Sequence, residues 1–444
     1  MSDTFDVNKA FKAFLPPSLL SVAASQFAGI VDASLVGNII GPSGLSGVVI
    51  SRPVLQAIFA LTMLYAASGA VMAGKAIGGG DRKKADSLMT FAVAGSIVLG
   101  LLFTIIGFLF IDPLSGMLCK SEELRPMATV YMKYMIAAAV PQMLMYTLHQ
   151  YVTIDGSPKL VTIAVAIGSA VNVILDIVFM KVFGMGIAGA ALATCIMYVL
   201  CCVLVLPHFF RKGSLRFATK GMLADINFRE LFTFGVPLFF STALISLQLA
   251  LYNDITVKYM GENGMVALAV CLQLFSFSMI VRAGTMRTIQ PIGAILCGKG
   301  DIAGIHTLMK KSYVFIAICL GIYAVCIALF PASIAKILGA ASPEALPFVL
   351  SALPAFSLYI IMHSLINTLM PVYQLYGQHA LSLFISIAET LMPVAGFYLM
   401  CRIAGNPWLG FAAGDLLVAA VVLIWCRISS RRRNLHPILL TPEL

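Results

Sequence analysis

Long apolar stretches recur along the whole chain and are separated by short segments that carry glycine, proline or charged residues. Each stretch has about 20 residues or more, enough to cross a hydrocarbon core roughly 30 Å thick as a helix. We expect twelve membrane spans, six in each half of the chain. The first six cover Phe14–Asn38, Ser46–Ala73, Leu88–Ile111, Ala128–Val152, Leu160–Met180 and Ile187–Pro207. The second six cover Leu231–Val257, Met265–Leu296, Ser312–Phe330, Pro347–Val372, Ala380–Cys401 and Trp408–Cys426.

The composition excludes a soluble protein. Of the 444 residues, 60% are hydrophobic and 11% are charged, whereas soluble domains carry roughly 25% charged residues. Most of the cysteines fall inside apolar segments without the spacing of metal ligands, where cysteine behaves as a small hydrophobic residue. The pattern predicts an all-α integral membrane protein without disulfides, zinc or a separate soluble domain.

Basic residues are distributed unevenly between the loops. If the N-terminus is cytoplasmic, about 18 Lys and Arg residues lie on the inner side and about 8 on the outer side, which is the bias that the positive-inside rule expects. Both termini are then cytoplasmic, and we expect a multi-pass protein of the cytoplasmic (inner) membrane of a prokaryote. This topology and anionic lipid explain the net charge of +10, so no nucleic-acid partner is expected.

The two halves of the chain repeat each other at an offset of about 220 residues. The offset pairs Pro17 with Pro237, Gly41 with Gly261, Gly44 with Gly264, Gly78 with Gly298, Gly80-Asp81 with Gly300-Asp301, and Phe110 with Phe330. Six spans per half give both halves the same orientation, so the pseudo-symmetry axis runs along the membrane normal. We expect an N-terminal lobe at 1–207, a cytoplasmic linker at 208–230, a C-terminal lobe at 231–430 and a cytoplasmic tail at 431–444.

Two six-helix lobes around a central cavity are a common plan of transporters, in which rocking of the lobes alternates access to the site. A channel or a membrane-embedded enzyme shares this topology. The chain has no HExxH or GxSxG motif and no filter-like repeat, so we expect neither.

Ionisable residues inside the predicted spans are the first candidates for function, because a charge inside a bilayer is costly. At a rise of about 1.5 Å per residue, Asp32 in the first span and Asp176 in the fifth lie at nearly the same depth below the outer side. Asn172 shares a helix face with Asp176 at i, i+4 spacing, and Thr194 in the sixth span reaches a similar depth. This all-oxygen set suits a hard cation or a proton. The structural alternative is hydrogen bonding between helices.

The C-terminal half carries Arg282 and Arg287 in its second span and Glu389 in its fifth. Arg287 and Glu389 both lie roughly 16 Å from the cytoplasmic side, so we expect an intramembrane ion pair or a contact with substrate. Arg282 is rotated by about 140° from Arg287 and is not expected to share its site. We expect Asp254, near the outer end of its span, and Asp415, in the outer third of the last span, to be interfacial. We expect His149 and His363 to be satisfied by hydrogen bonds.

Five segments resemble the multidrug and toxic compound extrusion (MATE) family. They are VDASLVGNIIGPSGLSGV in the first span, DGSPKL after the fourth, VNVILDIVF in the fifth, GIAGAALAT at the start of the sixth and FGVPLFF in the seventh. The resemblance covers essentially the full chain. It implies a two-lobe antiporter that exports drugs or metabolites while Na⁺ or H⁺ moves inward, with no cofactor.

The resemblance also implies roles for single residues. In the branch of the family with a cation site in the N-terminal lobe, Asp32, Asn172, Asp176 and Thr194 match the residues that bind the coupling ion. They are metal ligands if that ion is Na⁺. Pro17 matches a proline whose helix kink is tied to protonation of this site.

The chain departs from other branches of the family in two places. These carry an acidic residue in the seventh helix, where this chain has Ile245, and the tenth span of this chain has no acidic residue at all. A cation site built on those acids is therefore not expected in the C-terminal lobe. We expect a monomeric exporter of small organic compounds. Two alternatives are a lipid-linked saccharide flippase of the same superfamily, which would line its cavity with more cationic residues, and a non-transporting sensor on the same scaffold.

Overall fold

The chain is built of helices in the residues that its computed structural model describes, which are 6–119, 121–211, 214–218, 226–338, 340, 342–403 and 406–433. The N-terminal half contains α1 (Val7–Ile39), α2 (Pro42–Thr62), π-helical η1 (Met63–Ala67), α3 (Ser68–Gly78), α4 (Arg82–Leu109), α5 (Ile111–Leu118), α6 (Arg125–Ala137), α7 (Ala139–Ile154), α8 (Pro158–Ile177), π-helical η2 (Val178–Val182), α9 (Ile187–Val205) and the 3₁₀ turn η3 (Leu206–Phe210). The C-terminal half contains α10 (Phe228–Lys299), α11 (Ile302–Leu329), α12 (Pro331–Ile337), α13 (Leu346–Asn367), α14 (Met370–Leu375), α15 (His379–Ile403) and α16 (Leu409–Arg433).

The helices confirm the twelve predicted spans. In the described part of the chain, 10 helical stretches are long and apolar enough to cross a membrane. One of them, α10, contains two of the predicted spans, because its backbone leaves helical geometry at Gly261 (φ 63°, ψ −156°). A further span consists of α6 and α7, which are separated by a break at Ala138. Long exposed apolar faces on these helices suit contact with lipid tails.

The sequence repeat is reproduced in the backbone. Gly41 and Gly261 both have positive φ, 96° and 63°, at the turn between the first two spans of each half. Asp81 caps the start of α4 by accepting a hydrogen bond from the Lys84 N–H (3.0 Å), and its repeat partner Asp301 caps α11 through the Gly304 N–H (2.8 Å). Equivalent residues therefore make equivalent turns, which explains why glycine and aspartate recur at one fixed offset.

The helices form two compact units. Unit 2 comprises Pro16–Thr242, and unit 1 comprises Met1–Leu15 together with Ala243–Leu444. Each unit boundary falls inside a helix, α1 or α10. The predicted lobes, 1–207 and 231–430, share most of their residues with unit 2 and unit 1, and their exact limits stay a prediction. Residues 212–213, 219–225 and 434–444, in the predicted linker and tail, lie outside the described residues.

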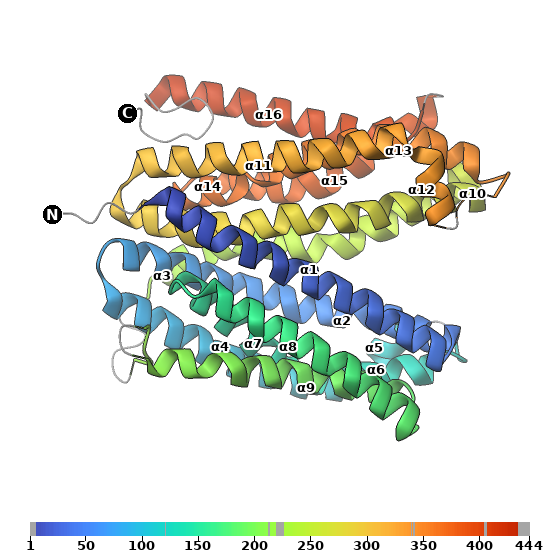
Figure 1. Ribbon diagram of the computed structural model, residues 1–444, viewed down its shortest axis with the longest axis horizontal. Coiled ribbons are helices and arrows are strands. Elements are labelled where there is room, and N and C mark those ends of the chain that lie inside the picture. The colour runs from blue at the N-terminus through green and yellow to red at the C-terminus, as the bar shows by residue number, and fades with distance from the viewer. Residues whose placement is uncertain are drawn as a thin grey trace. The chain divides into compact units, whose positions relative to one another are not determined.

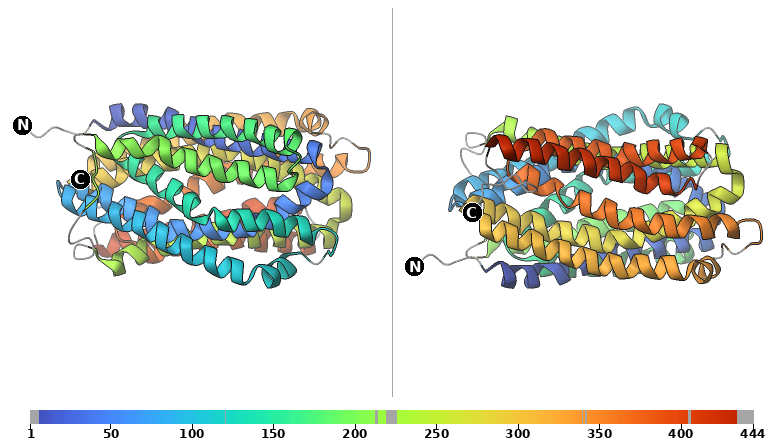
Figure 2. Two further views of the ribbon diagram at one scale, coloured as in Figure 1. Left: turned by 90° about the horizontal axis from the view of Figure 1, so that it is seen from below. Right: turned by 90° about the horizontal axis from the view of Figure 1, so that it is seen from above.

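The helices within each unit run along a common direction, as membrane spans do (Figures 1 and 2). In unit 2, α8 packs on α9, α4 on α7 and α2 on α6. In unit 1, α15 packs on α16, and α13 packs on both α11 and α16. Gly396 on α15 faces the backbone of Gly410 and Gly414 on α16, where a Cβ atom would collide with main-chain atoms. Such small residues allow two membrane helices to pack closely.

Candidate functional site

The two carboxylates singled out in the sequence lie close together inside unit 2. Asp32 on α1 and Asp176 on α8 interact with each other through their side chains. The side chain of Asp176 is fully buried, Asn172 is 4% exposed, and Asp32 and Thr194 are half-buried. The convergence predicted from helix depth is therefore present in the structure.

Several polar atoms of this cluster have no hydrogen-bond partner among the described residues. They are Oδ1 of Asp32, Nδ2 of Asn172 and both carboxylate oxygens of Asp176. A buried polar atom without a partner costs free energy, and a buried carboxylate costs more. Three of the four orphaned atoms are carboxylate oxygens, which are suitable ligands for a hard cation and suitable acceptors for a proton.

Tyr131 belongs to the same cluster and was not identified from the sequence. This buried residue on α6 lies beside Thr194 and close to both Asp32 and Asp176. A tyrosine near the outer end of a span carries no charge, so counting costly charges could not reveal it. Its phenolic hydroxyl adds a second hydroxyl oxygen to the carboxylate, amide and Thr194 hydroxyl groups already present.

Local packing fixes α8 against α9 at the site. Gly168 on α8 faces the sulfur of Cys201 on α9, and Gly189 on α9 faces the backbone of Phe179 in η2. The α-helical geometry of α8 changes to π-helical geometry one residue after Ile177, directly beyond Asp176. Short π-helical segments of this kind frequently occur at functional sites.

Pro17 connects α1 to α8 a few turns away from the carboxylates. Its carbonyl oxygen accepts a hydrogen bond from the Thr162 hydroxyl on α8 at 2.7 Å. Pro16 and Pro17 both lie within α1 and lack the N–H groups that helical hydrogen bonds require. The hinge role of Pro17 stays a prediction, but its hydrogen bond with Thr162 links the two helices that carry the carboxylates.

In unit 1, Glu389 lies among several polar groups. Arg287 is exposed, whereas Glu389 is 5% exposed and accepts a hydrogen bond from the Asn367 amide. Arg282, whose Nε is buried, also interacts electrostatically with Glu389. An Arg287–Glu389 pair remains a prediction. The expected interfacial position of Asp415 is wrong, because its side chain is fully buried.

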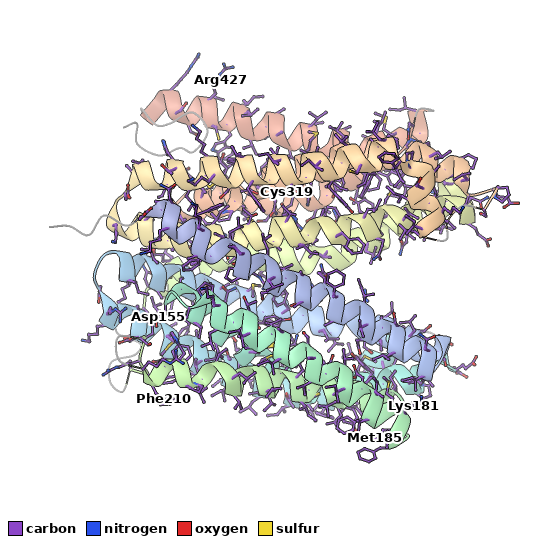
Figure 3. All side chains as sticks on the ribbon, in the orientation of Figure 1. Asp155, Lys181, Met185, Phe210, Cys319 and Arg427 are labelled. Carbon is purple, nitrogen blue, oxygen red and sulfur yellow. The ribbon has the colours of Figure 1, made fainter. Side chains whose placement is uncertain are left out.

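A polar cluster at one end of unit 2 was not identified from the sequence. Asp155, after α7, accepts hydrogen bonds from His208 Nε2 (2.8 Å) and the Leu215 N–H (3.0 Å). Asp86 also accepts a hydrogen bond from the Arg216 N–H (2.8 Å). These bonds fasten residues 214–218 to α4 and α7. Figure 3 shows Asp155 and Phe210 near one end of unit 2, and Lys181 and Met185 near the other.

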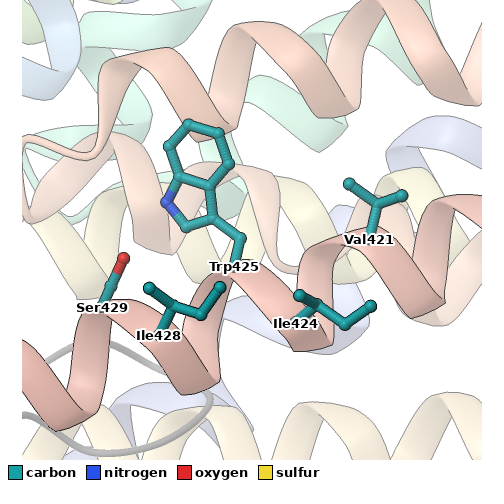
Figure 4. A pocket seen from close by; sticks show the side chains of 5 residues that line it. All are labelled: Val421, Ile424, Trp425, Ile428 and Ser429. Carbon is teal, nitrogen blue, oxygen red and sulfur yellow. The ribbon is translucent and has the colours of Figure 1, made fainter.

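A shallow pocket on α16 has little polar chemistry. Val421, Ile424, Trp425, Ile428 and Ser429 line it, all from the one helix (Figure 4). Ile424 and Ile428 are more than half and about half exposed, at 59% and 50%. A lipid tail suits such a surface, and the pocket lies on a different unit from the carboxylate cluster.

Comparisons with known proteins agree with the fold. The MatE family model matches residues 17–178. Multidrug export protein MepA of Staphylococcus haemolyticus is 23% identical over 328 residues, which cover 72% of this chain and 71% of that protein. A mutant of the Vibrio cholerae MATE transporter VcmN has a TM-score of 0.87 at 19% identity, over 96% of this chain and 98% of that one.

A second solved structure is a MOP-superfamily transporter from Pyrococcus furiosus, described as having a binding pocket of reverse polarity that suggests a different function. It has a TM-score of 0.84 at 20% identity and covers 96% of this chain and 97% of that one. These structures confirm the fold of two six-helix lobes.

Proposed function

We propose that this chain, which belongs to the multidrug and toxic compound extrusion family, exports small organic compounds and is driven by inward movement of Na⁺ or H⁺. The observation that carries the proposal is the contact between the half-buried Asp32 and the buried Asp176, which have three carboxylate oxygens without a hydrogen-bond partner among the described residues. Such an arrangement is costly unless an ion or proton binds there. A site that binds a cation reversibly is what a coupled transporter needs.

The composition of the site favours a small hard cation or a proton. Carboxylate, amide and hydroxyl oxygens surround it, and no group of three or more His, Cys, Asp or Glu suited to a transition metal occurs among the described residues. Asp32, Asn172, Asp176 and Thr194 would hold the ion, with the Tyr131 hydroxyl beside them.

Binding of the cation couples to helix movement through α1. The cation neutralises the repulsion between the carboxylates of Asp32 and Asp176, so it favours the arrangement in which α1 and α8 lie close together. The prolines at 16 and 17 weaken the hydrogen bonding of α1 and make this helix the element that can bend. Alternating access then follows from a change in α1 that cation binding favours.

Small organic compounds are the cargo class that the relatives support, since MepA is a multidrug export protein. The protein would act in the cytoplasmic membrane as a monomer. Both termini would lie in the cytoplasm, and the bias of basic residues supports this orientation.

Purified protein in vesicles, loaded with a panel of dyes and metabolites, tests the proposal. An imposed Na⁺ or H⁺ gradient should accelerate export of at least one compound, and the effective gradient identifies the ion. Movement of a lipid-linked saccharide without any dye transport would instead establish the flippase alternative. Absence of all transport, with the protein folded, would favour the sensor.

A further inference from the structure

A short non-helical segment of unit 2, residues 214–218, is bonded along one face of α4, and we refer to it as the strap. The N–H of Arg216 donates to Asp86 Oδ1 (2.8 Å), and the N–H of Ala218 donates to Thr90 Oγ1 (2.7 Å). Asp86 and Thr90 are one helical turn apart on α4, a rise of about 6 Å. Two residues of extended chain span about 6.6 Å, so the donors of the strap match the acceptors on the helix.

The beginning of the strap is fixed at a buried carboxylate. Asp155, whose side chain is 3% exposed, accepts a hydrogen bond from the Leu215 N–H (3.0 Å) and lies 3.8 Å from the guanidinium of Arg82 on α4. Leu215 itself is fully buried. The strap is therefore an ordered part of unit 2, and its exposed side chains are held in defined positions.

The carboxylates at this end of unit 2 are already bonded to the backbone. Asp81 caps the start of α4, and Asp86 and Asp155 accept hydrogen bonds from the strap. Arg211 and Arg216, by contrast, are exposed, and neither forms an ion pair with any residue that the structure describes. The positive charges of these two arginines are therefore available to a ligand.

Exposed aromatic rings lie next to these arginines in the chain. Phe210 precedes Arg211 and is 75% exposed, and Phe217 follows Arg216 and is 36% exposed. Asp155 and Phe210 lie near one end of unit 2 (Figure 3), which the predicted orientation places at the cytoplasmic surface of the membrane. Cations beside apolar rings at a membrane surface suit a ligand that has both a phosphate group and an apolar chain.

We propose that Arg211 and Arg216, positioned by the strap, bind the head-group phosphate of an anionic phospholipid in the inner leaflet, and that Phe210 and Phe217 contact its acyl chains. A guanidinium group suits this ligand because it can donate two parallel hydrogen bonds to one phosphate. Arg82, which is 51% exposed, adds positive charge to the same surface. The proposal concerns a lipid contact and stands whether or not the carboxylates of unit 2 drive transport.

Native mass spectrometry of the full-length protein, released from detergent micelles that contain phosphatidylglycerol or phosphatidylcholine with identical acyl chains, tests this site. The wild type should retain phosphatidylglycerol in preference to phosphatidylcholine. The double variant Arg211→Gln, Arg216→Gln should bind phosphatidylglycerol roughly tenfold more weakly or worse, because each cation near the membrane surface strengthens the attraction to anionic lipid. Lys181→Gln is the control, since it removes an exposed cation near the opposite end of unit 2 (Figure 3) and should leave the affinity unchanged.

Two substitutions of Asp86 test whether the strap positions the arginines. Asp86→Asn removes the negative charge but keeps an oxygen that can accept the hydrogen bond of the Arg216 N–H, so phosphatidylglycerol should bind at least as tightly as in the wild type. Asp86→Ala removes the same charge together with the acceptor. Its affinity for phosphatidylglycerol should be roughly twofold to tenfold lower than that of Asp86→Asn, because one hydrogen bond of the strap is lost.

The proposal has outcomes that would overturn it. Equal retention of both lipids by the wild type, or an equal effect of Lys181→Gln and the double arginine variant, would exclude a specific lipid site at this end of unit 2. Equal affinities in the two Asp86 variants would show that the strap does not position the arginines. Displacement of phosphatidylglycerol by millimolar inorganic phosphate would identify a free anion, and not a lipid, as the ligand.

Discussion

The residues of the unit 2 site carry polar atoms that have no hydrogen-bond partner among the described residues. Asp176 is fully buried, yet neither of its oxygens has a donor in the part of the chain that the structure describes, and the amide nitrogen of Asn172 has no acceptor there. Burial and missing partners together distinguish these residues from the many membrane threonines and serines whose hydroxyls bond to a carbonyl one turn earlier, such as Thr129 and Ser34.

Removing one neutral oxygen from the site should weaken ion binding without abolishing it. Thr194→Ala and Tyr131→Phe each delete one hydroxyl, worth about 0.5–1.5 kcal/mol. The ion concentration for half-maximal export should therefore rise roughly twofold to tenfold. Thr129→Ala is the matched control, because Thr129 is also half-buried and bonded to the carbonyl four residues earlier. Equal ion dependence in all three variants would exclude Thr194 and Tyr131 from the site.

In unit 1, the stability of the protein should depend on Arg282 more than on Arg287. Arg282→Met removes a buried cation that interacts with Glu389 and Asp415 and should cost about 3–5 kcal/mol, whereas Arg287→Met, at an exposed position, should cost less than about 1 kcal/mol. Thermal unfolding in detergent measures both. A double-mutant cycle showing strong coupling of Glu389 to Arg287, and none to Arg282, would restore the pair expected from helix depth.

The residue count along each span correctly predicted that Asp32 and Asp176 lie close together. A charged side chain in the membrane must face the protein interior, and the count gives its depth in the membrane. The same count gives no information on the direction in which a side chain points. It therefore placed Asp415 at the interface, and it could not show whether Arg282 or Arg287 faces Glu389. Tyr131 is uncharged, so a search for charged residues inside the spans could not identify it.

At the level of helices, glycines at the repeat positions make the turns possible. Gly41 and Gly261 combine positive φ with ψ near 180° (ψ −175° and −156°), a region that is essentially restricted to glycine. The sequence located both turns through the repeat offset. It did not predict the short helices α5 and α12, because only a single residue separates each of them from the span before it and no polar segment marks the end of that span.

Substitution of Gly261 should test this backbone requirement directly. Gly261→Ala should lower the free energy of unfolding by about 1–3 kcal/mol, since no atom lies within 4 Å of the added Cβ and only backbone strain opposes it. Gly321→Ala is the control, because Gly321 also has no atom within 4 Å but lies inside the helix α11, where alanine should be neutral or stabilising by up to about 1 kcal/mol. Equal unfolding midpoints in detergent would show that Gly261 carries no special strain.

At the scale of the whole molecule, the orientation is a prediction from the basic residues, and the segment 214–218 offers a test of it. Arg216 is exposed while its backbone is fastened to Asp86, and Phe183 is 65% exposed beyond η2. In a background without native cysteines, Arg216→Cys should resist an impermeant thiol reagent in intact cells and react after the membrane is opened. Phe183→Cys should react in intact cells. The reverse pattern would place both termini outside.

The fold of two six-helix lobes could be predicted because apolar length and internal repetition determine it. The exact limits of the units could not, since α1 and α10 each belong partly to both, and residues near 15 and 242 carry no polar break that marks a boundary. Packing contacts such as that of Gly235 on α10 with the backbone of Leu64 in η1 hold the start of α10 within unit 2.

Gradient-driven export in vesicles by Asp32→Asn and Asp176→Asn tests the central claim most directly. The wild type and the control Asp112→Asn, which neutralises an exposed carboxylate on α5, should export faster when a Na⁺ or H⁺ gradient is imposed. Each site variant should lose this acceleration while unfolding at the same temperature as the wild type or higher, because a buried carboxylate without its ion destabilises the protein. Undiminished acceleration in both site variants would contradict the account.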